Sequence, residues 1–169
     1  MHADVDALQK LMGYSAWAND VLYQAIAAAD ERVLSHPRPG RPGGAIGVLG
    51  HIYVVGMIWK GHLISKPHGF SARTLDTLPT LVDLRARQSE LDHWYVEFAS
   101  NLTMNERKAP IDFSFVDGGK GSMTAEEMLL HVANHGTYHR GYVADMLYDS
   151  GLKPPTVDLP VFIRDVLSG

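Results

Sequence analysis

Apolar residues recur at steps of three and four along four long stretches of the chain, which is the period of an α-helix with one buried face. The clearest series in the first stretch is Val5, Leu8, Leu11, Met12, Leu22 and Ile26. In the third stretch it is Leu81, Leu84, Leu91, Tyr95 and Phe98. The pattern predicts long helices over residues 3–29, 45–65, 77–101 and 124–149, and a shorter helix over residues 159–167.

The predicted helix ends carry local signals. Asp4 or Asp6 lies at the positive end of the first helix dipole. Thr124 can cap the last long helix, and Glu127, three residues further on, completes a capping box. Prolines and glycines occupy six of the eight positions from 37 to 44, which therefore cannot continue a helix and must form a connection.

Two stretches depart from the simple amphipathic pattern. The helix over residues 45–65 is apolar on most sides, which favours a place at the centre of a bundle. Between residues 108 and 122, Ile111, Phe113 and Phe115 alternate with polar residues before a glycine turn, which predicts a short extended segment. Because this connection is long for a helical bundle, we expect it to form a lid or a wall.

Together these elements predict one all-α domain over residues 1–169. The expected architecture is a four-helix bundle with a short C-terminal helix and a short extended and turn segment before the fourth helix. The composition suits such a domain, with 46% hydrophobic and 20% charged residues.

Charge and cysteine content exclude several classes of function. A formal net charge of -4 argues against nucleic acid binding through a basic face. The absence of cysteine excludes disulfides, thiolate metal ligands and a cysteine nucleophile, and it fits the reducing cytoplasm that we predict as the location. The N-terminus does not read as a signal peptide. No membrane span is expected, because His51, Lys60 and His62 interrupt the most apolar window.

Three of the nine histidines, His131, His135 and His139, share one face of the fourth predicted helix. Two imidazoles four residues apart can bind one metal ion, so either neighbouring pair could supply two ligands. The alternative is that each ring is an ordinary core or surface residue with a hydrogen bond, and an H-x-x-x-H pair alone is a weak signal.

His51 is the best candidate for a third ligand. It lies among Val48, Leu49, Ile52 and Val55, which predicts that it is buried, and a buried polar ring needs a partner. His62 is expected to face solvent. The remaining histidines fall in a terminus, in loops or on a polar helix face, where structural roles are favoured: His2, His36, His68 and His93.

Three blocks of sequence carry a family resemblance. Residues 134–141 read N-H-G-T-Y-H-R-G, residues 14–19 read Y-S-A-W-A-N, and residues 49–52 read L-G-H-I. The chain thereby resembles the DinB family, part of the DinB/YfiT-like superfamily of metalloenzymes, over essentially its whole length. One departure is Tyr142, where family members often have Gln.

The resemblance implies a bundle of up-down-down-up connectivity, usually assembled as a homodimer. It also implies a divalent metal ion held by His51, His135 and His139, with His131 as a core residue or one that supports the ligands. Residues near the ligands in sequence could orient the rings, and these are Tyr53, Asn134, Thr137 and Tyr138. For Arg140 a structural pairing with Asp20 or Asp145 is favoured over contact with an anionic substrate.

Three neutral imidazoles leave at least one coordination position open, as in catalytic zinc sites. Zinc and nickel are the favoured metals, and iron also suits these ligands. Two interpretations follow. By analogy with relatives that use low-molecular-weight thiols as cosubstrates, the chain is a metal-dependent small-molecule transferase or a hydrolase. Alternatively it is a non-catalytic metal-binding stress protein, since the family name refers to DNA-damage-inducible expression. Neither interpretation involves a membrane or direct nucleic acid binding.

Overall fold

The computed structural model describes residues 6–168, and this part of the chain is mostly helical. Four long helices form its body, and they are α1 (Ala7–Ile26), α3 (Gly44–Leu63), α4 (Leu81–Asn101) and α6 (Ala125–Asp149). The shorter elements are α2 (Glu31–Leu34), α5 (Met104–Lys108), strands β1 (Pro110–Ser114) and β2 (Lys120–Thr124), α7 (Leu159–Phe162) and the π-helical turn η1 (Ile163–Leu167).

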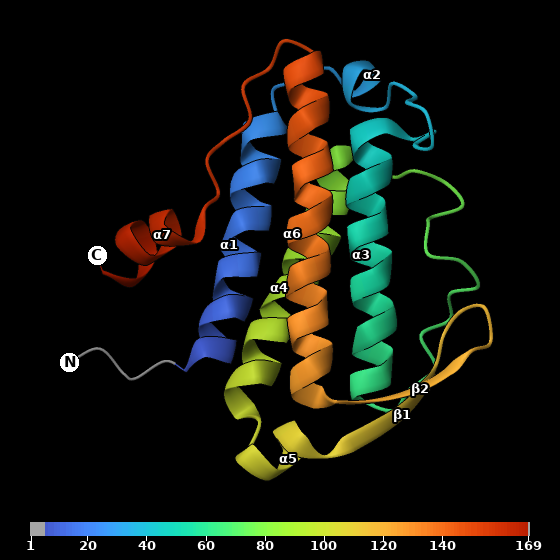
Figure 1. Ribbon diagram of the computed structural model, residues 1–169. Coiled ribbons are helices and arrows are strands. Elements are labelled where there is room, and N and C mark those ends of the chain that lie inside the picture. Colours follow the sequence, from blue (N-terminus) through green and yellow to red (C-terminus); the bar gives the residue numbers. More distant parts are fainter. Residues whose placement is uncertain (1–5, 169) are drawn as a thin grey trace.

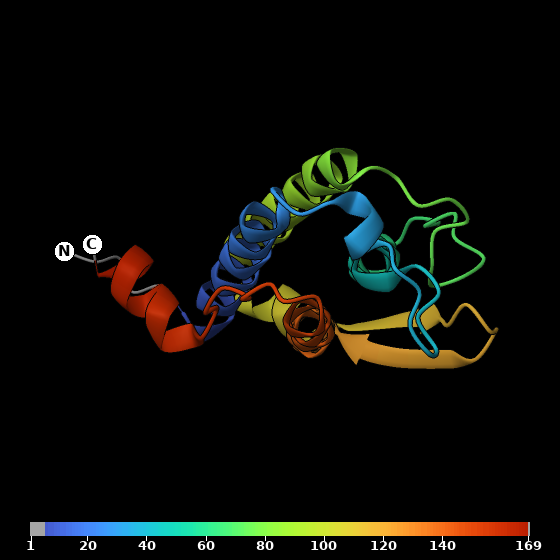
Figure 2. The same ribbon diagram turned by 90° about the horizontal axis from the view of Figure 1, so that it is seen from above.

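The long helices lie side by side, with α1 and α3 each packed against both α4 and α6. In Figure 1, α1 and α6 run in one direction along the bundle, while α3 and α4 run in the other. Seen from above, the β1–β2 hairpin projects beyond α3 and α6, and α7 lies at the opposite side, beyond α1 (Figure 2). The predicted dominance of helix is confirmed.

Side-chain caps mark the starts of α1, α4 and α6. Asp6 accepts hydrogen bonds from the backbone N–H groups of Leu8 and Gln9, so it is the N-cap of α1. Thr124 and Glu127 form the predicted capping box at the start of α6. The predicted start of the first helix at residue 3, with Asp4 as the alternative cap, lies outside the described residues.

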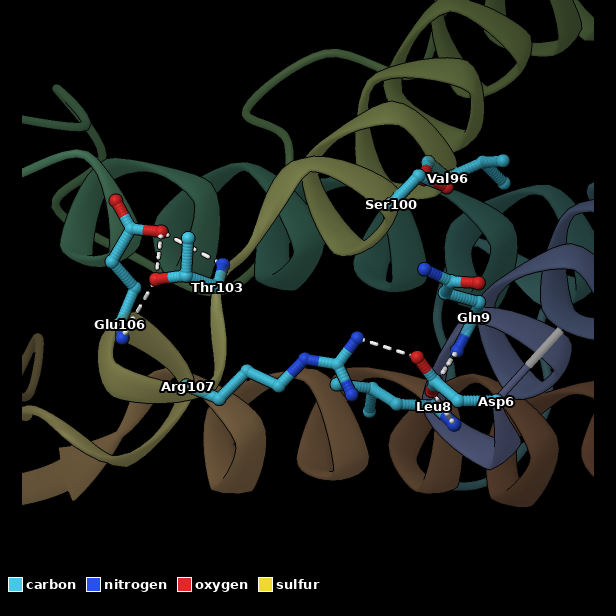
Figure 3. A network of polar contacts seen from close by, with 8 residues as sticks. All are labelled: Asp6, Leu8, Gln9, Val96, Ser100, Thr103, Glu106 and Arg107. Carbon is cyan, nitrogen blue, oxygen red and sulfur yellow. Dashed lines mark hydrogen bonds and ion pairs between the residues drawn. The ribbon is translucent and has the colours of Figure 1, made fainter. Parts of the chain in front are cut away.

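The short helices α2 and α5 were not predicted, because each is only about one turn long and has no measurable hydrophobic period. α5 connects α4 to the hairpin and is tied to α1 by an ion pair. Arg107 Nη2 lies 2.5 Å from Asp6 Oδ2, while Thr103 and Glu106 cap α5 in a second capping box (Figure 3). The N-terminal cap of the first helix therefore also holds the end of the bundle that carries the hairpin.

The segment predicted to be extended forms an antiparallel hairpin in which Phe113 pairs with Gly121. A Cβ atom at Gly121 would lie 2.6 Å from the Phe113 ring, so glycine is required opposite this aromatic residue. The ring packs edge-on against Trp59 of α3, with 5.0 Å between centroids. The hairpin is thus fixed against the bundle along one side of α3.

Helix α3 is buried on most of its surface, as its sequence predicts. Within the described residues it is long and apolar enough to cross a membrane by length and composition alone, yet 72% of the relevant window is buried inside the protein. The core helix of a soluble protein meets the same criteria. The packing therefore accounts for its apolar sequence.

The C-terminal segment covers α1 from outside. Phe162 is buried between Tyr14 and Trp17, with ring centroids 6.0 Å and 5.6 Å away. The Tyr14 hydroxyl donates a hydrogen bond of 2.8 Å to the carbonyl of Val157. The predicted short final helix is therefore present, as α7 and η1, and docks on the first helix.

Candidate metal centre

Helices α3 and α6 bring His51, His135 and His139 together. One ring nitrogen of each residue lies within 4.8 Å of the others, and the described residues contain no second group of three histidine or acidic side chains this close. The ring centroids are 4.9 Å apart for His51 and His135, and 4.6 Å apart for His51 and His139. The two histidines of α6 share one face because they are four residues apart.

The orientation of His51 is set by a backbone contact. Its Nδ1 atom lies 2.6 Å from the carbonyl oxygen of Arg73. Because a carbonyl can only accept, Nδ1 must carry the proton, and Nε2 then holds a lone pair. Such a contact on the second ring nitrogen is typical of metal-binding histidines.

This lone pair of His51 points toward helix α6. The Nε2 atoms of His51 and His135 are 3.1 Å apart. Two nitrogens that each lie about 2.0–2.1 Å from one tetrahedral zinc ion would be about 3.3–3.4 Å apart. The observed separation is close to this value, so a small adjustment of the rings admits an ion.

The surroundings keep the α6 histidines in the form that binds metal. Burial, helped by neighbouring His139 and His51, lowers the pKa of His135 to about 3. Burial, His51 and the positive charge of Arg41 lower the pKa of His139 to about 4. Both rings are therefore neutral at pH 7, and a neutral imidazole is the species that coordinates metal.

All three rings are half-buried, and His51 is less buried than its neighbours in sequence suggest. The reason is that two cavities open onto the group. The first, which we call the hairpin cavity, has a volume of about 650 Å³ and reaches all three histidines. Its other walls include Trp59, His131 and the hairpin residues 115–117, so the predicted lid or wall is a wall.

The second cavity, which we call the glycine-loop cavity, has a volume of about 520 Å³ and touches His51 and His139. Its remaining lining comes from residues 40–44, from Gly47 and Val48 of α3, and from Thr74, Leu75 and Leu78. A ligand could therefore reach the histidine group from either side.

The other histidines of the described chain stay outside the group. His131 packs against Trp59, with centroids 4.7 Å apart, and is 5.8 Å from the His135 ring. The expectation that His62 faces solvent is wrong. It is half-buried between Trp59 and His68, at 5.4 Å from each, because the hairpin and the loop after α3 cover this end of the helix. His36 and His93 are exposed, and His2 lies outside the described residues.

Arg140 is structural, but with different partners from those expected. It is 3% exposed and donates hydrogen bonds of 2.9 Å to Asn19 Oδ1 and to Thr137 Oγ1. Asn19 in turn donates to both carboxylate oxygens of Asp92, and the expected partner Asp20 pairs with Arg85 instead. The guanidinium therefore faces α1 and α4 and points away from the histidines.

Most of the residues expected to orient the rings have other roles. Thr137 bonds to Arg140 and to the carbonyl of Ala133, and Tyr53 packs against buried apolar residues of the core. Asn134 is exposed. The Tyr138 hydroxyl lies 2.5 Å from that of Tyr142, and its ring stands edge-on to His139 at 5.1 Å.

Two contributors to the site could not be identified from the sequence, and a third was marked only as a departure from the family pattern. They are the Arg73 carbonyl, the Arg41 guanidinium, which stacks 3.9 Å over the ring of Tyr142, and Tyr142 itself. A backbone acceptor in a loop has no residue signature. Tyr142 carried one signal, its departure from the common family residue.

Two comparisons with known proteins identify relatives of this chain. The family model of the DinB family matches residues 1–165, which include all four long helices and the three histidines. The chain is also 24% identical over 167 residues to Protein DinB of Bacillus subtilis (strain 168), an alignment that covers 91% of this chain and 92% of that protein.

Proposed function

This chain belongs to the DinB family, and from that premise we propose that His51, His135 and His139 bind one divalent transition metal at the active site of a small-molecule enzyme. The observation that carries the proposal is the convergence of three ring nitrogens from two helices, with the His51 tautomer fixed by the Arg73 carbonyl. Zinc and nickel are the proposed metals, and iron fits the same ligands.

The donor set favours a catalytic over a purely structural site. Three protein ligands leave a position for water or substrate, whereas structural zinc sites are closed by four. When bound, such an ion acidifies water or stabilises an anionic group of a substrate. The protein itself contributes neutral rings, two cavities that admit small molecules, and apolar walls around them.

We propose a transferase that uses a low-molecular-weight thiol, with a hydrolase as the second reaction class. Because the chain has no cysteine, the thiol must come from a cosubstrate. The alternative function is a metal-binding protein that is made under stress or DNA damage and has no catalytic role. The two cavities that meet at the histidines favour the enzyme, since a storage or sensing site needs no room for two reactants.

Metal binding is tested first. Protein purified without a histidine tag and stripped with chelator is titrated calorimetrically with zinc and with nickel. We expect about one ion per chain, with His51→Ala losing the tight site and His93→Ala keeping it, because His93 is exposed and lies outside the group. Equal binding by the two variants would refute the site.

Catalysis is tested separately. Metal-loaded protein is given a panel of thiols with an aryl halide, and in parallel a panel of activated esters. Rates above the uncatalysed background that disappear in His51→Ala would support the transferase or the hydrolase. Background rates with every pair, in protein that holds its metal, would favour the non-catalytic alternative.

The finer architecture and the setting of the protein are also proposals. We propose an up-down-down-up four-helix bundle, which the chain directions in Figure 1 support, and a homodimer in the cytoplasm without membrane or direct nucleic acid contacts. The negative net charge supports the absence of direct nucleic acid contacts, and the buried surface of α3 supports the absence of membrane contacts. Light scattering on purified protein tests the dimer: a mass of one chain at micromolar concentration would exclude it.

A further inference from the structure

We propose that the glycine-loop cavity binds the carboxylate of a small, partly apolar substrate, and that Arg41 is the residue that selects it. The inference rests on the proposed function, because the reacting part of the same molecule would then lie at the histidines. It adds the charge and the shape of the substrate, neither of which follows from the metal ligands.

Arg41 differs from most other arginines of the protein in having no carboxylate partner. Within residues 6–168, ion pairs join acidic side chains to five arginines, which are Arg32, Arg38, Arg85, Arg107 and Arg164. In the same range the Arg41 side chain takes part in no ion pair and no side-chain hydrogen bond. It is nonetheless half-buried, so its charge is partly withdrawn from water without a protein anion to balance it.

The guanidinium is held by its flat face. It lies 3.9 Å above the centroid of the Tyr142 ring, a cation–π contact that leaves the N–H groups at its edge free to donate. The Tyr142 hydroxyl is in turn bonded to that of Tyr138 on the same helix. A planar fork of donors fixed in this way suits a carboxylate, which it can bind through two parallel hydrogen bonds.

The loop that carries Arg41 is also fixed. The backbone N–H of Arg41 donates to the Arg38 carbonyl at 2.8 Å, and the Arg41 carbonyl accepts from the Arg38 N–H at 3.0 Å. Gly44 follows with φ +57, and a Cβ there would come within 2.6 Å of the carbonyl oxygens of Leu34 and His36. A side chain on so constrained a loop needs little ordering when a ligand binds.

The lining of the cavity is complementary to an anion with an apolar body. No aspartate or glutamate lines it, although the chain has 19 acidic residues and a net charge of -4. Its walls are apolar at Pro42, Val48, Leu75 and Leu78. Arg41 lines this cavity together with His51 and His139. An anion beside Arg41 would therefore lie next to the metal ligands.

Gly47 keeps the space open. It lies one turn before His51 on α3, and a Cβ atom added there would meet no other atom within 4 Å. A larger side chain at this position would extend into the cavity without displacing the protein around it. Gly47 thus offers a way to fill the cavity while the histidines and Arg41 stay in place.

The test measures binding of phenylacetate and of its neutral isostere phenylacetamide by ligand-observed NMR, with metal-loaded protein. We expect phenylacetate to bind at least about tenfold more tightly, as a charge-assisted pair to arginine allows. Arg41→Gln should reduce this preference to about twofold or less, whereas Arg38→Gln, which alters a neighbouring arginine paired with Asp149, should retain it. Gly47→Leu should abolish binding of both compounds.

Each opposite outcome overturns the proposal. Equal binding of the two compounds, or a preference that survives Arg41→Gln, would show that Arg41 does not select charge. Loss of phenylacetate in His51→Ala with full retention in Arg41→Gln would mean that the carboxylate binds the metal alone. Tighter binding of phenyl phosphate than of phenylacetate would mean that the cavity selects a phosphate and not a carboxylate.

The same titration in chelator-treated protein separates this inference from the proposed function. If the chain binds no metal, but the preference for phenylacetate still depends on Arg41, the cavity assignment stands and the metal enzyme does not. If metal binds to the three histidines and the carboxylate preference is absent, the metal site stands and the assignment of the cavity to a carboxylate fails.

Discussion

Helix α6 contributes to two polar clusters inside the bundle, and the two are built in opposite ways. On one face, Arg140 joins Asn19, which joins Asp92, and each contact is a hydrogen bond of 2.9–3.1 Å between side chains of this network. On the other face, His135 and His139 meet His51. The Nε2 atoms of His51 and His135 face each other, and all three rings line the hairpin cavity. In the first cluster the side chains of Arg140, Asn19 and Asp92 bond to one another, whereas in the second three ring nitrogens converge beside a cavity.

We expect this difference to separate a structural role from a functional one. A buried polar network whose members bond to one another adds to the stability of the fold. Nε2 of His135 can donate a hydrogen bond to Nε2 of His51 at 3.1 Å, whereas a single cation can accept a lone pair from each of the three rings. Residues adjacent in sequence, His139 and Arg140, belong to different clusters because successive helical residues point about 100° apart.

The largest expected effect is on metal binding through the histidine cluster. His135→Ala should weaken zinc binding by about a hundredfold or more, since one of three ligands is lost. The free energy of unfolding of the metal-free protein should change by only about 1 kcal/mol, because the ring is half-buried and borders an existing cavity. Calorimetry measures zinc binding, and urea denaturation measures the free energy of unfolding. If the metal-free variant lost several kcal/mol of this free energy, the histidine cluster would be structural like the arginine network.

The reverse is expected for the arginine network. Arg140→Met should lower the free energy of unfolding by about 2–4 kcal/mol, because it leaves Asn19 Oδ1 unpaired in the interior and removes the cation near Asp92. The folded fraction should still bind metal with the original stoichiometry. Arg87→Met, at an exposed position on α4, is the matched control and should change stability by no more than about 0.5 kcal/mol. Loss of metal from folded Arg140→Met would contradict the separation.

The clusters should also respond to pH with opposite signs in metal-free protein. Burial raises the pKa of Asp92 to about 7, so the native state holds a proton that the unfolded state releases, and stability falls as pH rises from about 4 to 7. For His135 and His139 the native pKa lies below the unfolded value near 6.5. Their contribution is complete above that pH and is lost as pH falls toward 4.

Two variants resolve these opposing slopes. Asp92→Asn should make the loss of stability between pH 7 and pH 4 steeper, because only the histidine contribution remains. His135→Ala should make the same loss shallower. Denaturant midpoints measured at half-unit pH intervals test both, and parallel profiles for the two variants would show that the assigned groups do not set the pH dependence.

The smallest expected effect distinguishes two glycines of α6. Gly141 is exposed and a Cβ there meets nothing within 4 Å, so Gly141→Ala should stabilise by up to about 1 kcal/mol through helix propensity. At Gly136 a Cβ would lie 3.1 Å from Arg140 Nη1, which is already held by Asn19. Gly136→Ala should therefore be at least about 0.5 kcal/mol less stable than Gly141→Ala. Equal thermal denaturation midpoints would mean that Gly136 makes no room for the network.

Local features of the sequence were enough to predict the helices that carry the site. The capping box at Thr124 and the Pro-Gly stretch before α3 act within a few residues, so their outcome does not depend on the rest of the fold. Helical spacing alone left two histidine pairs open, because His131 and His139 are both one turn from His135. The family resemblance favoured His139, and the structure turns His131 toward Trp59.

What the sequence could not predict depends on contacts between distant segments. Arg140 bonds to Asn19, which is 121 positions away, and nothing local to either residue distinguishes this partner from Asp20 or Asp145. The Arg73 carbonyl reaches His51 from a loop without a hydrophobic period. His51 was expected to be buried from its apolar neighbours, but it borders two cavities that exist only once the loops and the hairpin are in place.

We propose above all that one metal ion binds between His51, His135 and His139. Anomalous diffraction at the zinc edge, from crystals of untagged protein supplied with zinc, tests it most directly. We expect a single strong peak in each chain, about 2.0–2.1 Å from one nitrogen of each of the three rings. A peak at His62, His68 or His131, or no peak at the three-histidine group, would contradict it.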